Sequence, residues 1–444
     1  MPEASPAVIT AVATAVMFAL ILLRIPIGLA LGLAGFFGYG WLDGWGRATT
    51  MLTAVPAELI SGAYSFSVIP MFILMGAAAA HSGLSAELFN IAKAVARPGA
   101  RGTLATATIG ACGLFGAICG SSVATAATMG RIAVPEMRQA GYSAEFATGA
   151  VAAGGTLGIL IPPSVILVIY ALLAEQSVPV LFAAAMLPGF AMAMMCIMVA
   201  KLYVLVRPEA GPPSRIVYAR GERWRIVLRA WKVFAIFLLS IGGLYAGWFS
   251  PTEAAAIGAA MTILVGVFDR RLGTKEILAS IQETTIVSAS LFFIFLGALM
   301  YGRFIALTRI PYDLTQWVAS LGLSAQMVAL AIVGIYLLLG CFLESVSMVL
   351  ITVPVFLPLL QSMGYDAVWF GILLVVAVEM GLVTPPVGMN LFVIRAQNKD
   401  VSLPRIAFGA LPFLSAQVVM ILILVYWPRF TSLLPDLMGM ATAR

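Results

Sequence analysis

The sequence predicts an all-α polytopic membrane protein made of two inverted-topology repeats, each with five membrane spans and one re-entrant hairpin. Three observations lead to this prediction. Hydrophobic residues fill 62% of the 444 positions, charged residues only 10%, and the mean hydropathy is +1.05, far outside the soluble range. Apolar runs long enough to cross a bilayer recur along the chain. Prolines and small residues interrupt some of these runs at positions that repeat 223 residues later.

Charge and rare residue types exclude several other classes of protein. The net charge of +6 does not indicate nucleic-acid binding, because the basic residues cluster in short loops between apolar runs. The cysteines lie in apolar segments without metal-ligand spacing or a disulfide framework, so we interpret them as packing residues. His81 is the only histidine, which leaves no histidine cluster or histidine-based triad. The N-terminus lacks the basic region of a signal peptide, so the first apolar run is expected to be a permanent span.

Ten apolar runs have the length of a membrane span, about 17–25 residues. Two more runs are too long for one span and carry small or polar residues near the middle, so we interpret each as a re-entrant hairpin. Because five spans per half is an odd number, the second half must insert upside down relative to the first. The predicted spans are 7–24, 26–42, 66–82, 143–173 and 180–206 in the first half, and 230–249, 252–268, 285–302, 366–395 and 407–427 in the second.

This count divides the chain into three parts. The first repeat covers residues 1–206, a basic cytoplasmic linker covers 207–229, and the second repeat covers 230–444. Two moderately polar stretches occupy equivalent places in the halves and are predicted to be amphipathic helices on opposite membrane faces. These stretches are 47–64 and 272–284, the hairpins are about 103–138 and 325–361, and the broken helices are about 143–173 and 366–395.

The distribution of Lys and Arg agrees with this arrangement. If the loop that holds Lys93, Arg97 and Arg101 is cytoplasmic, 20 of the 25 Lys and Arg lie on the cytoplasmic side, as the positive-inside rule requires. Both termini are then periplasmic, the first hairpin enters from the cytoplasm and the second from outside. We therefore expect a multi-pass protein of the bacterial inner membrane. The basic residues left outside are Arg47, Arg303, Arg309, Arg429 and Arg444.

The hairpins and broken helices share residues at one fixed offset. Lipid-exposed breaks are costly, because backbone groups stay unpaired, so breaks are kept only where they are buried in protein or line a cavity. A duplicated, discontinuous membrane element is typical of a secondary transporter whose site lies between two repeats. An offset of 223 relates Ser122 to Ser345, Pro135 to Pro358, Gly141-Tyr142 to Gly364-Tyr365, Gly158 to Gly381, and Pro162-Pro163 to Pro385-Pro386.

The breaks predict sites for a small hard cation and for a carboxylate. One half-helix ends in free carbonyls, which suit Na⁺ together with Ser or Thr hydroxyls, and the next begins with free amides, which suit a carboxylate. We expect the tip Cys119–Ser122 to face a break at Gly154–Gly158, and the tip Glu344–Ser347 to face a break at Gly381–Thr384. No catalytic residue and no metal other than Na⁺ is expected. The predicted Na⁺-binding residues are Ser121, Ser122, Gly155, Thr156, Gly158, Glu344, Ser345, Gly381 and Thr384.

A second group of residues beside the breaks is predicted to contact substrate. Glu344 and Glu379 lie at membrane depth, where ionisable groups are costly and mark function; either could hold a cation, take up a proton or pair with a cationic group. Asn390 could equally hydrogen-bond substrate or cap the resumed helix. Close packing of small residues explains one break but not its recurrence. The predicted substrate-binding residues are Thr125, Pro162, Pro163, Ser347, Glu379, Pro385, Pro386 and Asn390.

A further pattern concerns the glycine-rich spans. The second span carries Gly28, Gly32, Gly35 and Gly38 at helical spacing. Small residues on one helix face permit close approach by another helix. From the sequence alone, that helix could belong to this chain or to a partner.

The motifs around the breaks match a known family. The first half carries Gly120-Ser121-Ser122 with Ala124-Thr125, Pro135-Glu136-Met137, Gly141-Tyr142, the run 155–164, Tyr170 and Pro188-Gly189; the second carries Pro354, Pro358, Gly364 and the run 381–392. Over nearly the whole chain these motifs resemble the large membrane subunit of tripartite ATP-independent periplasmic (TRAP) transporters, the DctM-like family. Two departures are Cys119, where the family often has Ser, and Glu344, where Asp is common.

The resemblance implies a Na⁺-coupled importer of an organic acid anion, such as a C4-dicarboxylate, sialic acid or a similar carboxylate, working by an elevator motion. Hairpins and broken helices would form the moving transport domain, and the other spans the scaffold. Besides the lipid bilayer, it implies two partners: a small four-span membrane subunit (DctQ-like) and a periplasmic substrate-binding protein (DctP-like). Na⁺ is the implied coupling ion, and no other cofactor is expected.

Two other functions are weighed against this one. A one-component Na⁺/dicarboxylate symporter can share the plan of inverted repeats and paired hairpins, and a neighbouring reading frame for a secreted binding protein would separate the two. A membrane-embedded enzyme is disfavoured, because the sequence has no His–carboxylate metal cluster, no Ser–His arrangement and no phosphate-binding loop. The lack of a nucleotide motif likewise disfavours an ATP-driven pump.

Overall fold

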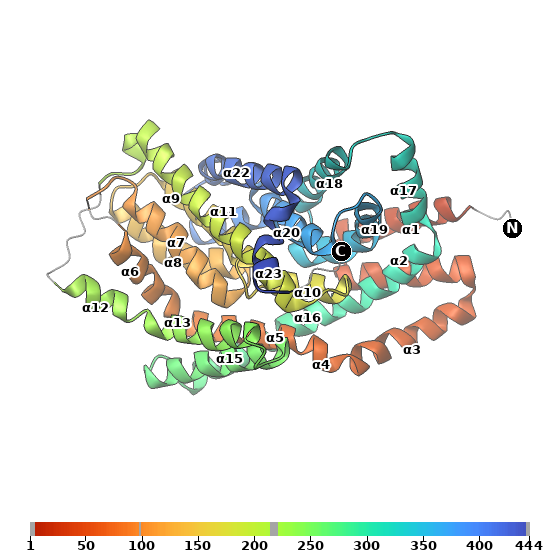
Figure 1. Ribbon diagram of the computed structural model, residues 1–444, viewed down its shortest axis with the longest axis horizontal. Coiled ribbons are helices and arrows are strands. Elements are labelled where there is room, and N and C mark those ends of the chain that lie inside the picture. Colours follow the sequence, from red (N-terminus) through yellow and green to blue (C-terminus); the bar gives the residue numbers. More distant parts are fainter. Residues whose placement is uncertain (1–4, 97–98, 214–220, 441–444) are drawn as a thin grey trace.

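The computed structural model describes residues 5–96, 99–213 and 221–440, and this part of the chain is helical without a β-strand (Figure 1). Part of the predicted linker, residues 214–220, and the basic residue Arg97 lie outside the described residues. The helices of the first half are α1 (Pro6–Leu22), α2 (Ile27–Asp43), α3 (Trp45–Ser61), α4 (Ala63–Phe66), α5 (Val68–His81), α6 (Leu84–Val95), α7 (Thr103–Cys119), α8 (Ser122–Gln139), α9 (Ala144–Leu160), α10 (Val165–Leu173) and α11 (Val178–Val206).

The second half contains a corresponding series. Its helices are α12 (Glu222–Leu228), α13 (Trp231–Phe237), α14 (Gly243–Tyr245), α15 (Pro251–Phe268), α16 (Thr274–Leu307), α17 (Ile310–Ser320), α18 (Ala325–Gly340), α19 (Ser345–Ser362), α20 (Ala367–Val383), α21 (Met389–Gln397), α22 (Leu403–Tyr426) and α23 (Leu433–Leu437).

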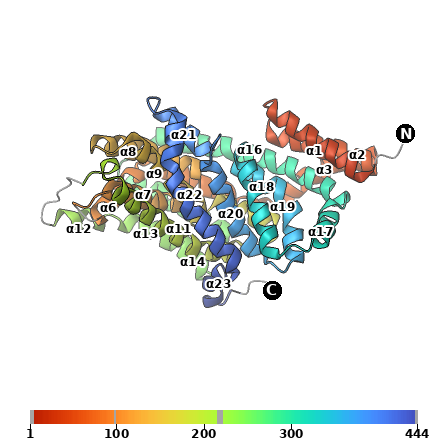
Figure 2. The ribbon, with the colours of Figure 1, turned by 90° about the horizontal axis from the view of Figure 1, so that it is seen from above.

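The bounds of several helices repeat at the offset found in the sequence. Helix α19 begins and ends 223 residues after α8, and α20 begins and ends 223 residues after α9. The peptide bonds Pro162–Pro163 and Pro385–Pro386, which have the same spacing, are both cis. In both views of the ribbon the α7–α8 pair and the α18–α19 pair lie towards opposite ends of the molecule, with α11 and α20 between them (Figures 1 and 2). The opposite membrane orientation of the halves stays a prediction.

Seven helical segments among the described residues are long and apolar enough to cross a bilayer, or eight when α9 and α10, bent by 42°, count as one span. Three of the ten predicted spans contain apolar helices of only 17 residues, namely α1, α2 and α20. Helix α19, predicted as one arm of a hairpin, is 18 residues long and qualifies by length and composition. The chain is therefore a multi-pass membrane protein, and its spans differ in length more than the sequence indicates.

One predicted boundary is wrong, and three helices lie in stretches for which the sequence predicts no helix. The stretch 272–284 and the span at 285–302 form one continuous helix of 34 residues, α16, because no Pro or Gly interrupts the chain between Gly273 and Gly297. The supposed loop around Lys93 contains helix α6, and α17 was not expected at all. The predicted linker contains α12, which is followed by α13 and a π-helical turn at Leu238–Gly242.

The glycine face of α2 packs against a helix of the same chain. A Cβ on Gly28 would lie 2.6 Å from the carbonyl oxygen of Phe293, and one on Gly35 would lie 2.6 Å from the backbone nitrogen of Tyr301, both on α16. Only glycine allows backbones to approach this closely. Of the two explanations left open by the sequence, packing within this chain is therefore the one found in the structure.

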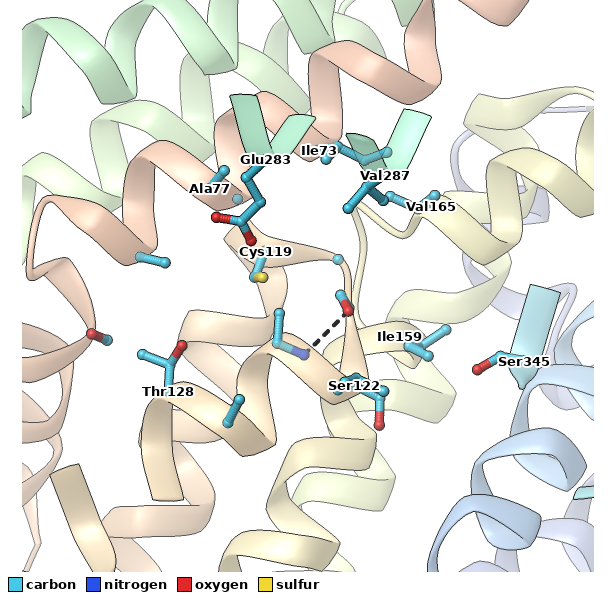
Figure 3. Close-up of a pocket in the computed structure, with 18 of the residues that line it drawn as sticks. Ile73, Ala77, Cys119, Ser122, Thr128, Ile159, Val165, Glu283, Val287 and Ser345 are labelled. Carbon is cyan, nitrogen blue, oxygen red and sulfur yellow. Dashed lines mark hydrogen bonds between the residues drawn. The ribbon is translucent and has the colours of Figure 1, made fainter. Parts of the chain in front are cut away.

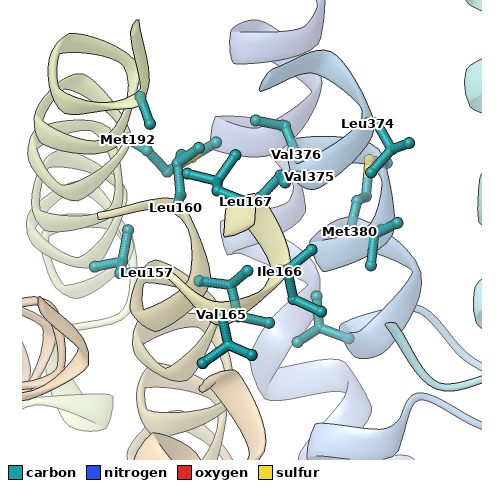
Figure 4. Close-up of a cluster of buried hydrophobic side chains, with 14 of the residues drawn as sticks. Leu157, Leu160, Val165, Ile166, Leu167, Met192, Leu374, Val375, Val376 and Met380 are labelled. Carbon is teal, nitrogen blue, oxygen red and sulfur yellow. The ribbon is translucent and has the colours of Figure 1, made fainter. Parts of the chain in front are cut away.

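Each hairpin crosses the broken helix of its own repeat at a pair of glycines. A Cβ on Gly116 of α7 would lie 2.3 Å from the Cα of Gly158 on α9, and a Cβ on Gly340 of α18 would lie 2.7 Å from the Cα of Gly381 on α20. Beside these crossings the two broken helices pack together through large buried apolar side chains, among them Leu157, Leu160, Val165, Ile166, Val375, Val376 and Met380 (Figure 4). The hairpin tips are thus held beside both breaks.

Candidate functional site

A cavity of about 890 Å³ is lined by both hairpin tips. One side comes from residues 119–124 at the start of α8, and another from residues 344–346 at the start of α19. Helices α5 and α16 close the opposite side, where the carboxylate of Glu283 points into the cavity towards Cys119 (Figure 3). Ser122 and Ser345, which the 223-residue offset relates, lie in the same cavity wall on either side of Ile159 (Figure 3).

Four helices begin at this cavity. The first residues of α8, α10, α19 and α21 contribute Ser122, Val165, Ser345 and Met389 to its lining. The first amides of a helix have no intrahelical partner and carry partial positive charge, so they attract anions. Ser121 caps α8 by accepting a hydrogen bond from the Ala124 amide at 3.3 Å. The N-termini of helices from both halves of the chain, which attract anions, therefore lie at the same cavity.

Each tip contacts the break of its own repeat, but the breaks lie further along the chain than predicted. The Gly154–Gly158 run is part of α9, and the chain leaves the helix only at Ile161–Ser164; in the second repeat it does so at 384–388. A Cβ on Gly120, whose φ is +63°, would lie 3.0 Å from the Pro163 carbonyl oxygen. The Cys341 thiol lies 3.8 Å from the Pro385 carbonyl oxygen. The predicted tip-to-break contact thus exists at the prolines, and in the first repeat also at Gly158, where a Cβ would lie 3.1 Å from the Ser121 carbonyl oxygen.

The two repeats are also linked to each other through buried polar side chains. The Asn390 side-chain amide on α21 donates a hydrogen bond of 2.6 Å to the Ser122 hydroxyl on α8. The Gln417 amide on α22 donates one of 3.4 Å to the Thr156 hydroxyl on α9. Helix α8 packs on α21, and α10 packs on α19, so each hairpin contacts the broken helix of the other repeat.

The structure brings only some of the predicted site residues to the cavity surface. Ser121, Ser122, Glu344 and Ser345 line it. Asn390 is fully buried behind it as the second residue of α21, so it does not cap that helix, whose N-cap is Gly388. The predicted residues that are not part of the cavity lining are Thr125, Gly155, Thr156, Gly158, Pro162, Pro163, Ser347, Glu379, Gly381, Thr384, Pro385, Pro386 and Asn390.

Several lining residues were not predicted as site residues. Thr128 lies about one turn after Thr125 on α8, and Arg131 lies about one turn after Thr128, so helical spacing along α8 could have indicated both. Glu283 pairs with His81 at 3.1 Å across α16 and α5. Nothing in the sequence relates these two residues, because they are 202 positions apart and lie on helices outside the recurring motif.

The family was established by comparison with known proteins. Residues 14–430 match the family described as "Tripartite ATP-independent periplasmic transporter, DctM component". This chain belongs to that family. It is therefore a large permease subunit of the TRAP type, a transport protein rather than an enzyme.

Two relatives and one solved structure are similar along most of this DctM-family chain. The C4-dicarboxylate TRAP transporter large permease protein DctM of Pseudomonas aeruginosa is 36% identical over 85% of this chain and 88% of its own length. The sialic acid TRAP transporter large permease protein SiaM of Vibrio cholerae is 29% identical over 88% of this chain and 91% of its own length. The crystal structure of the YdaH transporter of Alcanivorax borkumensis shares the fold, with a TM-score of 0.61 and 14% identity. The similarity covers 88% of this chain and 90% of the YdaH chain.

Proposed function

We propose that this chain is the large transmembrane subunit of a Na⁺-coupled TRAP transporter that imports an organic acid anion delivered by a periplasmic binding protein. The observation that carries the proposal is the convergence of four helix N-termini from both repeats on one cavity of about 890 Å³. Relatives named for C4-dicarboxylate and sialic acid transport support a carboxylate as the substrate class. The alternative is a one-component Na⁺/dicarboxylate symporter with the same plan.

The substrate carboxylate would bind at the starts of α8 and α19. Four residues in the first turns of these helices line the cavity, namely Ser122, Val123, Ser345 and Val346. Backbone amides at the start of a helix favour negative charge without adding a titratable group. Arg131 in the same lining adds a full positive charge. The cavity volume is within the range of pockets that hold small organic ligands.

The Na⁺ ions would bind at the tips, between the hydroxyls and the carbonyls at each helix end. Sodium prefers hard oxygen ligands, and its charge would offset that of the anion. Ser122 and Ser345 offer hydroxyls, and Gly158 belongs to the last turn of α9, where carbonyls lack a partner along the helix. The residues proposed for Na⁺ are the tip residues Ser121, Ser122, Glu344 and Ser345, with Gly158, Gly381 and Thr384 beside the breaks.

Replacing Ser122 or Ser345 by Ala should raise the Na⁺ concentration needed for half-maximal uptake. Loss of one neutral hydroxyl ligand corresponds to roughly 0.5–1.5 kcal/mol, or about a two- to twelvefold increase in that concentration. The measurement is uptake against external Na⁺ in cells with the complete transporter. Ser362→Ala is the matched control, because its exposed hydroxyl binds only the Leu359 carbonyl at the far end of α19. An unchanged Na⁺ dependence in both tip variants would place the Na⁺ sites elsewhere.

We also propose the inverted topology, with residues 1–206 and 230–444 as the repeats and both termini in the periplasm. The ion pairs support it, because each joins residues assigned to the same side. On the cytoplasmic side these pairs are Lys93–Glu136 and Arg138–Asp400, and on the periplasmic side Arg303–Glu58. A second cavity, lined by Lys93, Arg229 and Arg271, shares His81 and Gly83 with the first, so the cavity would open to the cytoplasm.

Single cysteines should report this topology. The natural cysteines are buried, so an impermeant thiol reagent should not reach them. Glu209→Cys in the linker is expected to stay unlabelled in intact cells and to react after the membrane is permeabilised. Gln361→Cys at the end of α19 is expected to react in intact cells. The side chains of Glu209 and Gln361 are both exposed, and the two positions differ in the side of the membrane on which they are predicted to lie. Labelling of residue 209 from outside would contradict the inverted arrangement.

A further inference from the structure

Arg131 lies in the wall of the cavity, on the helix that begins at the first hairpin tip. It belongs to α8, is exposed, and lines the cavity together with the start of the same helix. Among the residues that the structure describes, it forms no ion pair, whereas Arg138 on the same helix pairs with Asp400 at 2.7 Å. A guanidinium group stays charged at every physiological pH. Its charge is therefore available to an anion in the cavity.

The carboxylates in the same lining have other partners. Glu283 pairs with His81 at 3.1 Å. The Glu344 carboxylate accepts a hydrogen bond of 3.3 Å from the Ser347 hydroxyl. Among the described residues that line the cavity, Arg131 is the only lysine or arginine. The one permanent positive charge of this lining is thus left without a negative partner from the chain.

Small side chains separate Arg131 from the start of α8. Nine residues of helix lie between Ser122 and Arg131, which corresponds to about 13.5 Å along the axis. Long side chains on a helix lean back towards its N-terminus, which shortens this distance for the guanidinium group. The cavity face of α8 between the two carries Ala124, Ala127 and Thr128. The wall therefore presents anion-attracting amides, then a stretch of small side chains, then a guanidinium group.

We propose that Arg131 pairs with a second anionic group of the substrate, while the first binds at the starts of α8 and α19. Arg131 then determines specificity, because a short dianion satisfies both ends of this wall and the corresponding monoanion satisfies one. A guanidinium group donates two parallel hydrogen bonds to a carboxylate, which gives the contact a defined geometry as well as charge. The inference rests on the proposed function in placing the first carboxylate at the helix starts.

The test compares succinate with butyrate, which has the same carbon chain and one carboxylate fewer. The thermal unfolding midpoint of the purified complex with its small subunit is measured against each anion in saturating Na⁺ at neutral pH. A ligand that binds only the folded state raises this midpoint, and the selectivity of the binding protein does not enter. The parent should need at least about tenfold less succinate than butyrate for the same rise, as a charge-assisted contact implies. Arg131→Gln should lose this preference and keep the butyrate titration of the parent.

Arg138→Gln is the matched control, because it removes the same charge from the same helix outside the cavity lining. It should keep the preference of the parent for succinate. An equal preference in the parent and in Arg131→Gln would overturn the proposal, and so would a parent complex that succinate does not stabilise.

Arg131→Lys is a second variant that keeps the charge and loses the fork of parallel donors. Its preference for succinate should lie between that of the parent and that of Arg131→Gln. A preference equal to the parent's would contradict the two-bond contact, even if Arg131→Gln failed to fold. A preference as small as that of Arg131→Gln would contradict a pairing of charges.

Failure of the proposed function would give a different result. Uptake by the parent would then be independent of Na⁺ or of the binding protein, whatever the succinate titrations show. Uptake that depends on both, together with a succinate preference that survives in Arg131→Gln, would reject only the role of Arg131.

Discussion

Replacing Gly116 by Leu should reduce Na⁺-driven uptake by at least about tenfold and lower the thermal unfolding midpoint of the complex. A Cβ at this position would lie 2.3 Å from the Cα of Gly158, so both backbones would have to separate. Overpacking of this kind costs roughly 1–3 kcal/mol, and about 1.4 kcal/mol corresponds to a factor of ten. The separation would move the first hairpin tip away from its break. Uptake is affected most, because the proposed sites need both elements in register.

Gly110→Leu is the matched control on the same helix. A Cβ on Gly110 meets no atom within 4 Å, so the helix keeps its position and gains in helix propensity. In the second repeat, Gly340→Leu should behave like Gly116→Leu, and Gly334→Leu should behave like its control, since Gly334 also faces open space. If Gly116→Leu and Gly110→Leu transported equally well, the close crossing of hairpin and broken helix would have no role in transport.

The hairpins and broken helices could be predicted because proline and glycine, which have strong backbone preferences, lie at the interruptions of the apolar runs. Proline lacks the amide N–H that a helix interior needs, and the pairs at 162–163 and 385–386 mark both breaks, whereas the single prolines Pro135 and Pro358 remain inside helices. The glycines were misread for a physical reason. A Cβ on Gly154 would lie 2.8 Å from the Cys112 sulfur, and one on Gly155 would lie 2.9 Å from the Cβ of Ala126. These glycines allow α9 to pack between the hairpin arms and leave the helix intact.

The polarity of a stretch predicted the ends of helices less well than the positions of proline and glycine did. Residues 272–284 are polar enough to indicate a surface helix, but helix α16 continues through them to Leu307. Where side chains change from polar to apolar along a helix, its surroundings change from water to lipid or protein. The backbone hydrogen bonds continue, so the helix does not end there. Helix α6 was missed for a related reason, since its twelve residues are too few and too polar for a span.

Contacts between the repeats could not be predicted from the sequence. Asn390 and Ser122 are 268 residues apart, and Gln417 and Thr156 are 261 apart. Such pairs depend on how α8 packs on α21 and α9 on α22, which the local pattern does not encode. For the same reason Glu379 was grouped with substrate contacts, although it is buried outside the cavity lining.

A second large effect on uptake is expected when the periplasmic binding protein is omitted. In the described part of the chain the connections on the proposed periplasmic side are short, for example Ala174–Ser177 between α10 and α11, and they form no domain that could capture substrate. Omitting the binding protein should therefore reduce uptake of dilute anion to background. We expect uptake to fall as well when the small subunit is omitted, because α1 and α2 expose the apolar side chains of Val12, Val16, Phe37 and Trp41, a face that a membrane partner would cover.

The most direct test of the account is reconstitution in liposomes with an inward Na⁺ gradient. The three components are added one at a time, and uptake of the labelled anion that the binding protein carries is measured. The account predicts uptake only when this chain, the small subunit and the binding protein are all present, and its loss when K⁺ replaces Na⁺ outside. Robust uptake of free anion by this chain alone would contradict the tripartite assignment and would favour the one-component symporter.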